Sequence, residues 1–263
     1  MLMHRIKKLY ALLPPLLSRD LRERYAGSAF GIFWTFLQPV LFILLYWLVF
    51  SQVLKIRIRV DTGDMPFLPF LLSGILPWFA IQDGLIRGTS SLLEKRHVIK
   101  KVMFPAELFP LSSVLSAFIH HSIGLVLFLI GFFIWKGAIS ATQIAFIAML
   151  MCIQILIVSG LSLFLSSLSV YVRDVIQVLG VALQVVFYTS TILYPLNAVP
   201  GKLKYIVLLN PMTALAEAYH KTILYDSFPD YKGFLYLIVV MIASVTAGIF
   251  VFRKLKKGFA DVL

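Results

Sequence analysis

Six long tracts of this sequence contain no Lys, Arg, Asp or Glu, and they constrain the fold more than any other feature. The tracts are Tyr25–Leu54, Met65–Gln82, Leu108–Trp135, Gly137–Val172, Val175–Gly201 and Gly233–Phe252. About 20 apolar residues suffice for a helix to cross the hydrocarbon core of a bilayer. Each tract is that long or nearly so, which predicts an all-α integral membrane protein with six transmembrane helices.

The composition also indicates a membrane environment. Of the 263 residues, 60% are hydrophobic and only 14% are charged, whereas about 25% of the residues in a soluble domain are charged. The formal net charge is +12, and the basic residues lie at the ends of the tracts, where Lys and Arg meet lipid headgroups. We therefore expect membrane lipids as partners and no nucleic acid.

We expect a single transmembrane domain over residues 1–263, with both termini on the same side. The expected crossings are residues 29–54, 66–88, 106–135, 141–169, 174–196 and 232–253. If the termini are cytoplasmic, the cytoplasmic segments hold 16 of the 24 Lys and Arg residues. Cytoplasmic loops carry an excess of Lys and Arg, so this bias places both termini in the cytoplasm. The basic cluster Lys55–Arg59 lies on the other side and runs against the bias.

The sequence pattern of residues 200–228 predicts a helical hairpin and not a further crossing. Asn210 and Pro211 interrupt this moderately apolar segment. Asn is a favoured N-cap, and Pro is favoured at the first helical position. Neither Leu203–Leu209 nor Met212–Tyr225 is long enough to span a bilayer. We expect a short re-entrant hairpin in the outer leaflet, placed where it can form an outer gate.

Residues 1–28 predict an N-terminal segment at the inner interface. An amphipathic helix in Met1–Leu17 would have Leu2, Ile6, Leu9 and Leu13 on one face, with Arg5 and Lys8 off it. A helix of this kind lies in the plane of the membrane interface. The alternative is a frayed terminus.

Two tracts carry stripes of polar and aromatic side chains. At 100° per residue, each stripe falls on one helix face: Thr35, Gln38, Phe42 and Tyr46 in the first tract, and Gln177, Gln184, Tyr188 and Thr191 in the fifth. Polar side chains within a membrane face the bundle interior or a cavity. One interpretation is a substrate channel, in which amides and hydroxyls pair with sugar hydroxyls and sugar rings pack on aromatic rings. The other is hydrogen bonding between packed helices.

Two pairs of ionisable residues lie near or within the tracts. Asp83 and Arg87 are one helical turn apart, which predicts an ion pair within one helix. His120 and His121 lie near the centre of the third tract. A hydrogen bond between helices is favoured over a proton relay for the histidine pair.

The sequence contains no catalytic motif. It has no G-x-x-x-x-G-K-[ST] phosphate-binding loop, no H-E-x-x-H and no G-x-S-x-G. Its single cysteine, Cys152, excludes a cysteine-based metal site. We expect no catalytic residue, no metal and no bound cofactor in this chain. If ATP drives transport, a separate polypeptide binds ATP and Mg²⁺ and hydrolyses the ATP.

The segment Arg87–Glu107 is the best place for such a motor to act. It has the pattern of a short charged helix between two membrane helices. The residues expected to couple to the ATPase are Glu94, Lys95, Arg96, His97, Lys100 and Lys101. The alternative is a solvated connection that is basic because it is cytoplasmic.

Several segments, in chain order, resemble the type-2 ABC exporter permeases that move lipid-linked polysaccharide. Arg19–Val40 resembles the opening of these permeases, Val102–Leu111 resembles their entry to the third helix, and Tyr171–Val175 matches the loop before the fifth. The run from Tyr194-Pro195 through Val199-Pro200 to Leu209-Asn210-Pro211 resembles their outer segment. The resemblance covers nearly the whole chain.

This resemblance implies partners, a substrate and a location. Such permeases are homodimers with a central channel, and they pair with two copies of an ATP-binding cassette ATPase subunit in the cytoplasmic (inner) membrane of bacteria. They export O-antigen, capsule or teichoic-acid polymers on a polyprenyl diphosphate or another lipid. The resemblance implies lipid-headgroup contacts at Arg19, Arg22, Arg24 and Tyr25. It also implies an outer gate at Tyr194, Pro195, Pro200, Asn210 and Pro211.

Two other functions stay open at this point. An ABC permease for a small hydrophobic compound or drug would share the architecture and differ only in its substrate. A proton-coupled secondary transporter would use His120 or His121 and need no ATPase. Inverted repeats should then be visible in the sequence, and we find none.

Overall fold

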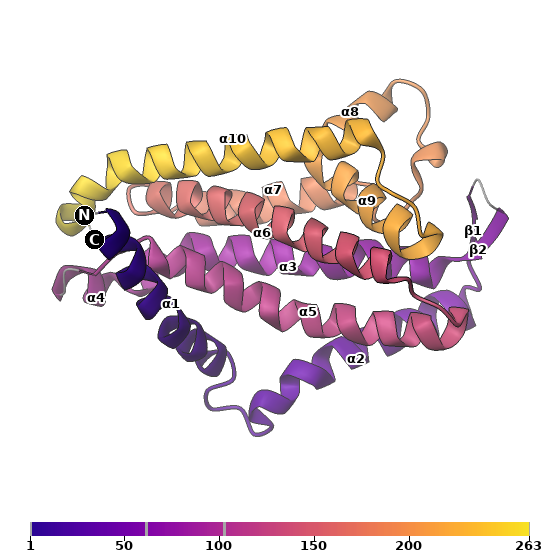
Figure 1. Cartoon of the computed structure of the whole chain (residues 1–263), viewed down its shortest axis with the longest axis horizontal. Coiled ribbons are helices and arrows are strands. Elements are labelled where there is room, and N and C mark those ends of the chain that lie inside the picture. Colours follow the sequence, from indigo (N-terminus) through magenta and orange to yellow (C-terminus); the bar gives the residue numbers. More distant parts are fainter. Residues whose placement is uncertain (1, 61–62, 102–103, 263) are drawn as a thin grey trace.

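The computed structural model describes residues 2–60, 63–101 and 104–262. Its long helices run side by side along the longest axis of the molecule (Figure 1). Both ends of the chain lie at one end of this bundle, together with the short helix α4 (Arg96–Lys101). We call this the terminal end. We call the opposite end of the bundle, where a hairpin of two short strands lies, the hairpin end. The two ends of the chain thus lie at the same end of the bundle, and the side of the membrane on which they lie stays a prediction.

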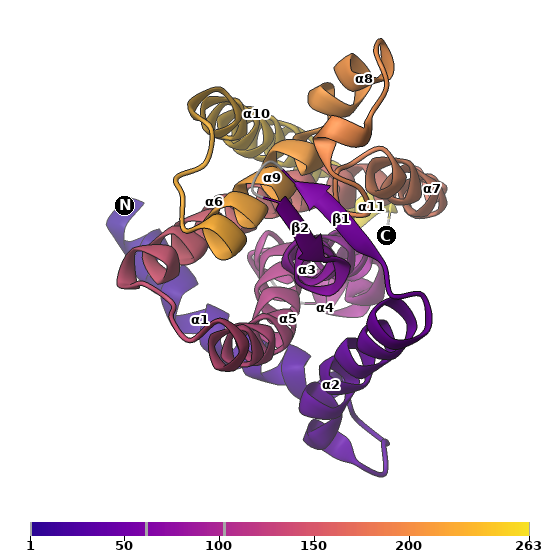
Figure 2. The same ribbon diagram turned by 90° about the vertical axis from the view of Figure 1, so that its right-hand side faces the viewer.

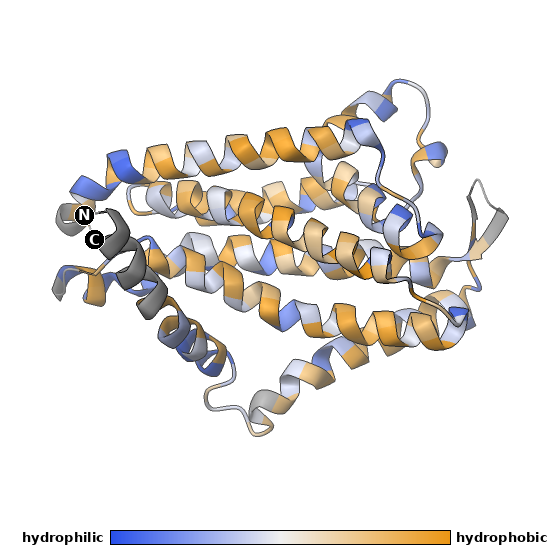
Figure 3. Cartoon of the chain, in the orientation of Figure 1, coloured by the Kyte–Doolittle hydropathy of each residue, from blue (hydrophilic) through white to orange (hydrophobic). Residues whose placement is uncertain are grey.

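Within the described residues, five helices are long and apolar enough to cross a membrane. They are α2 (Trp34–Tyr46) with its π-helical continuation Trp47–Val53, α3 (Phe67–Glu94), α5 (Leu108–Lys136), α6 (Ala141–Ser169) and α10 (Tyr231–Leu255). Figure 3 shows hydrophobic residues along the middle of the bundle and hydrophilic residues gathered near its two ends. The chain is therefore an all-α membrane protein, apart from one small hairpin of strands.

The remaining predicted crossing, residues 174–196, is helical over only part of its length. Helix α7 (Val175–Tyr188) has 14 residues. At 1.5 Å per residue it covers about 21 Å, less than the roughly 30 Å of a hydrocarbon core. The chain then continues in turns, with a 3₁₀ turn at Leu196–Ala198. The expected sixth transmembrane helix is thus not established by the length of α7.

Four further α-helices are described. They are α1 (Leu2–Glu23), α8 (Leu203–Leu209), α9 (Pro211–Tyr225) and α11 (Phe259–Val262). Helix α1 packs against α5. Helices α8 and α9 meet at Asn210, whose side-chain oxygen accepts a hydrogen bond from the Met212 N–H (2.8 Å). Pro211 occupies the first helical position, so the predicted start of this helix is confirmed.

A two-stranded antiparallel hairpin, which the sequence analysis did not predict, follows the first crossing. Strand β1 (Arg57–Val60) pairs with β2 (Gly63–Pro66), and Val60 lies opposite Gly63. The segment alternates basic and β-branched residues, a period of two that favours a strand. Ile58 packs against the main hydrophobic core of the bundle, which includes Phe67 and Phe70 of α3. This contact holds the two strands against the bundle.

Helix α3 is the centre of the bundle, with the other long helices arranged around it (Figure 2). In its most apolar 18-residue window 72% of residues are buried, against none in the corresponding window of α2. Helices α2 and α7 flank the same side of α3 in the end-on view. Helices α2 and α7 both expose large apolar side chains, including Leu44, Leu45, Val178 and Val181.

A second, smaller core fixes the end of the chain at the terminal end. Phe259 of α11 is buried with Leu92 of α3 and Ala106, close to the start of α5. Two polar contacts support it: Lys256 pairs with Glu107, and the Tyr171 hydroxyl donates to the Leu255 carbonyl (2.9 Å). The segment after α10 is thereby tied to both ends of the loop that contains α4.

Helices α6 and α10 approach closely through small residues. A Cβ added at Gly248 would collide with the carbonyl group of Gly160, and one added at Gly160 would collide with the backbone of Ser244. Small residues let membrane helices pack backbone to backbone. The absence of a side chain at Gly160 and Gly248 is therefore what permits this contact.

We expect Gly248→Ala to destabilise the protein, because its new methyl group would overlap the Gly160 carbonyl. Overpacking of this kind costs about 1–3 kcal/mol. The matched control is Gly131→Ala on α5, where an added Cβ meets nothing within 4 Å. Ala forms helix better than Gly, so this variant should melt at or above the wild-type temperature in detergent. Equal melting temperatures for the two variants would rule out the close contact.

Candidate functional site

Three ion pairs join the end of α1, with the turn that follows it, to α3. They are Asp20–Arg87 (2.9 Å), Arg24–Asp83 (2.7 Å) and Glu23–Lys95 (2.7 Å). The predicted ion pair between Asp83 and Arg87 within α3 is therefore wrong. The end of α1 lies beside α3, and its opposite charges take both residues as partners.

The two histidines of α5 extend this network. The Tyr25 hydroxyl and His120 Nδ1 share a hydrogen bond of 2.9 Å, and His121 Nε2 lies 3.3 Å from Asp83 Oδ2. The two imidazole rings meet edge to face, with centroids 4.7 Å apart. Both histidines are thus engaged by polar partners, which agrees with the hydrogen-bonding interpretation of the pair.

The network contains buried donors that the chain does not use. The Arg24 side chain is only 11% exposed, and its Nη1 contacts Asp83. Its Nε and Nη2, the Nε of Arg87 and the Oγ of Ser28 are buried without a hydrogen-bond partner among the described residues. Buried polar groups in native proteins nearly always have partners. The cluster is therefore suited to bind an acceptor that does not come from this chain.

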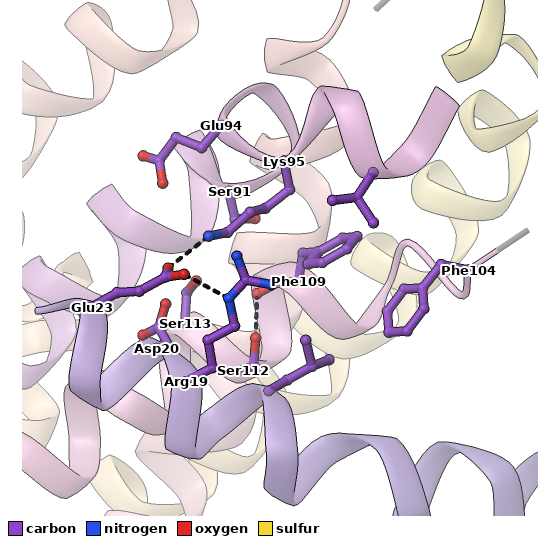
Figure 4. Close-up of a pocket in the computed structure, with 12 residues that line it drawn as sticks. Arg19, Asp20, Glu23, Ser91, Glu94, Lys95, Phe104, Phe109, Ser112 and Ser113 are labelled. Atoms are coloured by element: carbon purple, nitrogen blue, oxygen red, sulfur yellow. Dashed lines mark hydrogen bonds and ion pairs between the residues drawn. The ribbon is translucent and has the colours of Figure 1, made fainter. Parts of the chain in front are cut away.

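A cavity of about 150 Å³ lies beside these ion pairs (Figure 4). Arg19, Asp20 and Glu23 of α1 line it on one side, and Ser91 and Lys95 line it on the other. Hydrogen bonds from Lys95 and Arg19 lower the pKa of the Glu23 carboxyl. A lowered pKa keeps this carboxylate ionised at neutral pH, so it holds both bases on the rim of the cavity.

The four predicted lipid-headgroup residues fall into two groups. Arg19 and Arg22 are exposed on α1. Arg24 and Tyr25 instead lie inside the bundle, against Asp83 and His120. The headgroup role stays a prediction for all four residues. Only Arg24 combines a full charge, burial and free N–H groups.

The predicted coupling residues lie on and before α4. Arg96, His97 and Lys100 are exposed, and Glu94 is exposed at the end of α3. Lys95 differs, because its ammonium group contacts Glu23 of α1. The side chain of Lys101 lies outside the described part of the structure. The predicted short charged helix in this loop is confirmed by α4, and its coupling role stays a prediction.

The two predicted channel stripes lie on α2 and α7, on the same side of α3 (Figure 2). On α7, the side chains of Gln177, Gln184 and Tyr188 are exposed, whereas Thr191 is buried beyond the end of the helix. On α2, Gln38 is exposed and Thr35 is buried. The ring of Phe42 lies 5.7 Å from Phe79, and Tyr46 lies 6.1 Å from Phe50. The stripe residues with exposed side chains are thus the two glutamines and Tyr188 on α7, and Gln38 and Phe42 on α2, whereas Tyr46 is half-buried.

Side chains cap the C-terminal end of α7. Its last four carbonyls, those of residues 185 to 188, accept hydrogen bonds from Thr189, Asn210, Ser190 and Tyr194, in that order. The last four carbonyls of any helix lack helical partners. Here the predicted outer-gate residues Tyr194 and Asn210 provide two of the four donors. Asn210 therefore joins two helices, because it caps the start of α9 and the end of α7 at once.

The two helices of the predicted outer hairpin differ in burial. On α8 only Val207 is buried, whereas ten of the 15 residues of α9 are buried. The Gln143 amide donates to the Thr222 and Ile223 carbonyls of α9, and Lys136 donates to the Leu224 carbonyl. Helix α9 is thus part of the bundle, and α8 is the exposed member of the pair.

The remaining outer-gate residues are prolines. Pro195 is half-buried, whereas Pro200 and Pro211 are exposed.

A buried amide also holds α9 from within the bundle. Gln154 of α6 donates to the Pro77 carbonyl (2.7 Å) and accepts from the Tyr219 hydroxyl (2.9 Å). These contacts connect α3, α6 and α9 at one point.

Sequence reasoning missed the contacts between helices. Asp20, Glu23 and Arg24 follow a helical spacing of three and four residues, and Asp83, Arg87 and Lys95 carry the opposite charges. These complementary charges were the available signal that the two segments lie side by side. No comparable signal marks Gln154 or the second hydrogen bond of Asn210, since both depend on distant segments.

Comparisons with known proteins agree over nearly the whole chain. A family model described as ABC-2 type transporter matches residues 14–224. The chain is 28% identical to the O-antigen export system permease protein RfbA of Myxococcus xanthus, over 97% of this chain and 98% of that protein. It is 26% identical to RfbA of Klebsiella pneumoniae, over 97% and 96%. Its identity to the polysialic acid transport protein KpsM of Escherichia coli is 21%, over 89% and 90%.

We expect Asn210→Asp to separate the two functions of this residue. Aspartate keeps the acceptor that caps α9 but has no N–H group for the Val186 carbonyl. The change also removes the donation to the Thr189 hydroxyl, and each lost bond should cost about 0.5–1.5 kcal/mol. Hydrogen exchange should therefore rise at the turns after Tyr188 and stay unchanged at the start of α9. The control Gln177→Glu, an amide-to-acid change at an exposed position near the start of α7, should alter neither site. Faster exchange at the start of α9 alone would contradict the assignment.

Proposed function

Because the chain belongs to the ABC-2 type transporter family, we propose that it is the transmembrane subunit of an ATP-driven exporter of a lipid-linked polysaccharide. The observation that carries this proposal is full-length similarity to relatives named for O-antigen export and polysialic acid transport. The chain itself supplies the membrane part. A separate ATP-binding subunit, present in two copies, binds ATP with Mg²⁺ and hydrolyses it.

The proposed membrane arrangement has six crossings in the cytoplasmic membrane of a bacterium, with the terminal end in the cytoplasm. The positive charge of α4 and of the last turn of α10 supports this orientation. The sixth crossing comprises α7 and the turns that follow it. Irregular backbone at membrane depth requires partners within the protein. The four capped carbonyls of α7 meet this requirement.

The substrate channel is proposed to form between two copies of the chain, along the side that carries α2 and α7. These helices expose Leu44, Leu45, Val178 and Val181, so these side chains are available to pack against a second copy. Gln38, Gln184 and Tyr188 supply the polar and aromatic groups that a glycan needs. A small hydrophobic substrate would not need these amides.

The two ends of the channel have different proposed roles. At the terminal end the lipid diphosphate meets the basic residues of α1 and the turn after it, and the exposed face of α4 meets the ATPase. At the hairpin end α8 is the movable part of the outer gate, because nearly all of it is exposed. The buried helix α9 stays fixed while α8 moves. The re-entrant position of this pair in the outer leaflet is part of the same proposal.

Deletion of the gene tests the proposed function, and we expect loss of the surface polysaccharide. Complementation of the deletion with variants that narrow the channel tests the path of the substrate. We expect Gln184→Trp and Tyr188→Trp to block export, because bulk matters most in a path for a polymer. Ala182→Trp, also exposed on α7 but about 140° away from the stripe at 100° per residue, should restore export. All three proteins should insert and dimerise. Full export with tryptophan at both stripe positions would contradict the channel role of the stripe and favour packing between helices.

Charge reversal at the proposed coupling surface should uncouple the two subunits. We expect the double variant Glu94→Lys with Arg96→Glu to abolish export while the permease stays folded, because both exposed side chains would present the wrong charge to the ATPase. Lys257→Glu, an exposed reversal at the same end, is the control and should export normally. Co-purification of the ATPase subunit measures the contact directly. Undiminished co-purification and normal export in the double variant would remove α4 from the interface.

A further inference from the structure

We propose that Asp83, His120 and His121 are positioning residues, which hold Arg24 and Tyr25 so that the free N–H groups of Arg24 face the diphosphate of the lipid carrier. This inference rests on the proposed function, because the diphosphate belongs to the proposed substrate. It narrows the headgroup contact from four candidate residues to one buried guanidinium. It also assigns a role to the histidine pair of α5.

The division of the Arg24 donors is the first argument. Nη1 is held by Asp83 at 2.7 Å, while Nε and Nη2 are buried without a partner among the described residues. A guanidinium offers its donors in a planar fork that matches a phosphate group. The ion pair with Asp83 holds one end of this fork. The remaining two N–H groups can then contact the oxygens of one phosphate.

The charges around Arg24 are the second argument. Asp83 and Asp20 balance Arg24 and Arg87 within the network. A charged side chain at membrane depth is costly unless paired, so the two carboxylates make it possible to keep Arg24 inside the bundle. The free Nε of Arg87 and hydroxyl of Ser28 add further unused donors. An incoming anion therefore finds donors in place.

The two histidines contact the residues next to Arg24, which are Asp83, its ion-pair partner, and Tyr25, the next residue in the chain. His121 Nε2 lies 3.3 Å from the same Asp83 oxygen that contacts Arg24, and the ring of Phe79 lies 6.2 Å from the His121 ring on another side. His120 holds the Tyr25 hydroxyl at 2.9 Å. The turn that carries Arg24 and Tyr25 is therefore attached to α3 by Asp83 and to α5 by His120. Neither histidine needs to touch the lipid.

The test measures binding of a polyprenyl diphosphate without glycan to the permease–ATPase complex in nanodiscs, by titration and native mass spectrometry. Arg24→Ala tests the headgroup contact itself, and we expect binding at least tenfold weaker, because two charge-assisted hydrogen bonds are lost. Asp83→Asn and His121→Phe should weaken binding by a similar factor, about tenfold. His121→Gln retains a side-chain N–H for Asp83 and should bind like wild type.

Two controls separate positioning from a purely structural role. Glu107→Gln removes the carboxylate of a different ion pair at the terminal end, that with Lys256, and should leave binding unchanged. The melting temperature of each variant is measured in the same nanodiscs. If His121→Phe and Asp83→Asn bind as wild type while Arg24→Ala does not, the positioning role is wrong and the proposed function stands. If Arg24→Ala binds as wild type, the headgroup contact is wrong as well. Losses of binding that follow the melting temperature alone, or no rescue by His121→Gln, also overturn the inference.

Discussion

Lipid offers no hydrogen bonds, so a helix that ends inside the bundle must find its partners in the protein. This constraint accounts for much of the structure around α7 and α9. Thr189, Ser190, Tyr194 and Asn210 donate to the last four carbonyls of α7. Gln143 and Lys136 do the same for the end of α9. Two helices that are too short to span a membrane are thereby accommodated beside five that are long enough.

The same constraint applies to charge at the terminal end. The turn after α1 brings Arg24 into the bundle, and Asp83 pairs with it there. Buried ion pairs contribute little to stability, but removal of one partner is costly because it leaves an unpaired buried charge. We therefore interpret the role of the network as positioning and not as stabilisation. It fixes the end of α1 against α3 and α5, beside the cavity of Figure 4.

Much of this fold was predictable from local patterns. The uncharged tracts predicted the long helices, Asn210-Pro211 predicted the start of α9, and the charged loop predicted α4. Patterns that depend on distant segments were not predictable. The ion pair expected within α3 was wrong because the charges of α1 were nearer, and the burial of α9 depends on packing against α3, α6 and α10. The roles of Gln184, Tyr188 and the outer-gate residues remain predictions, since they need a substrate and a second copy.

Transport in a purified system tests the central claim most directly. The permease and its ATPase subunit would be reconstituted in proteoliposomes with a fluorescent lipid-linked glycan, and access of a glycan-cleaving enzyme to each leaflet would be followed. The account predicts that ATP moves the glycan to the opposite leaflet, and that a small hydrophobic dye is not moved. ATP-driven movement of the dye with the glycan left in place would contradict it.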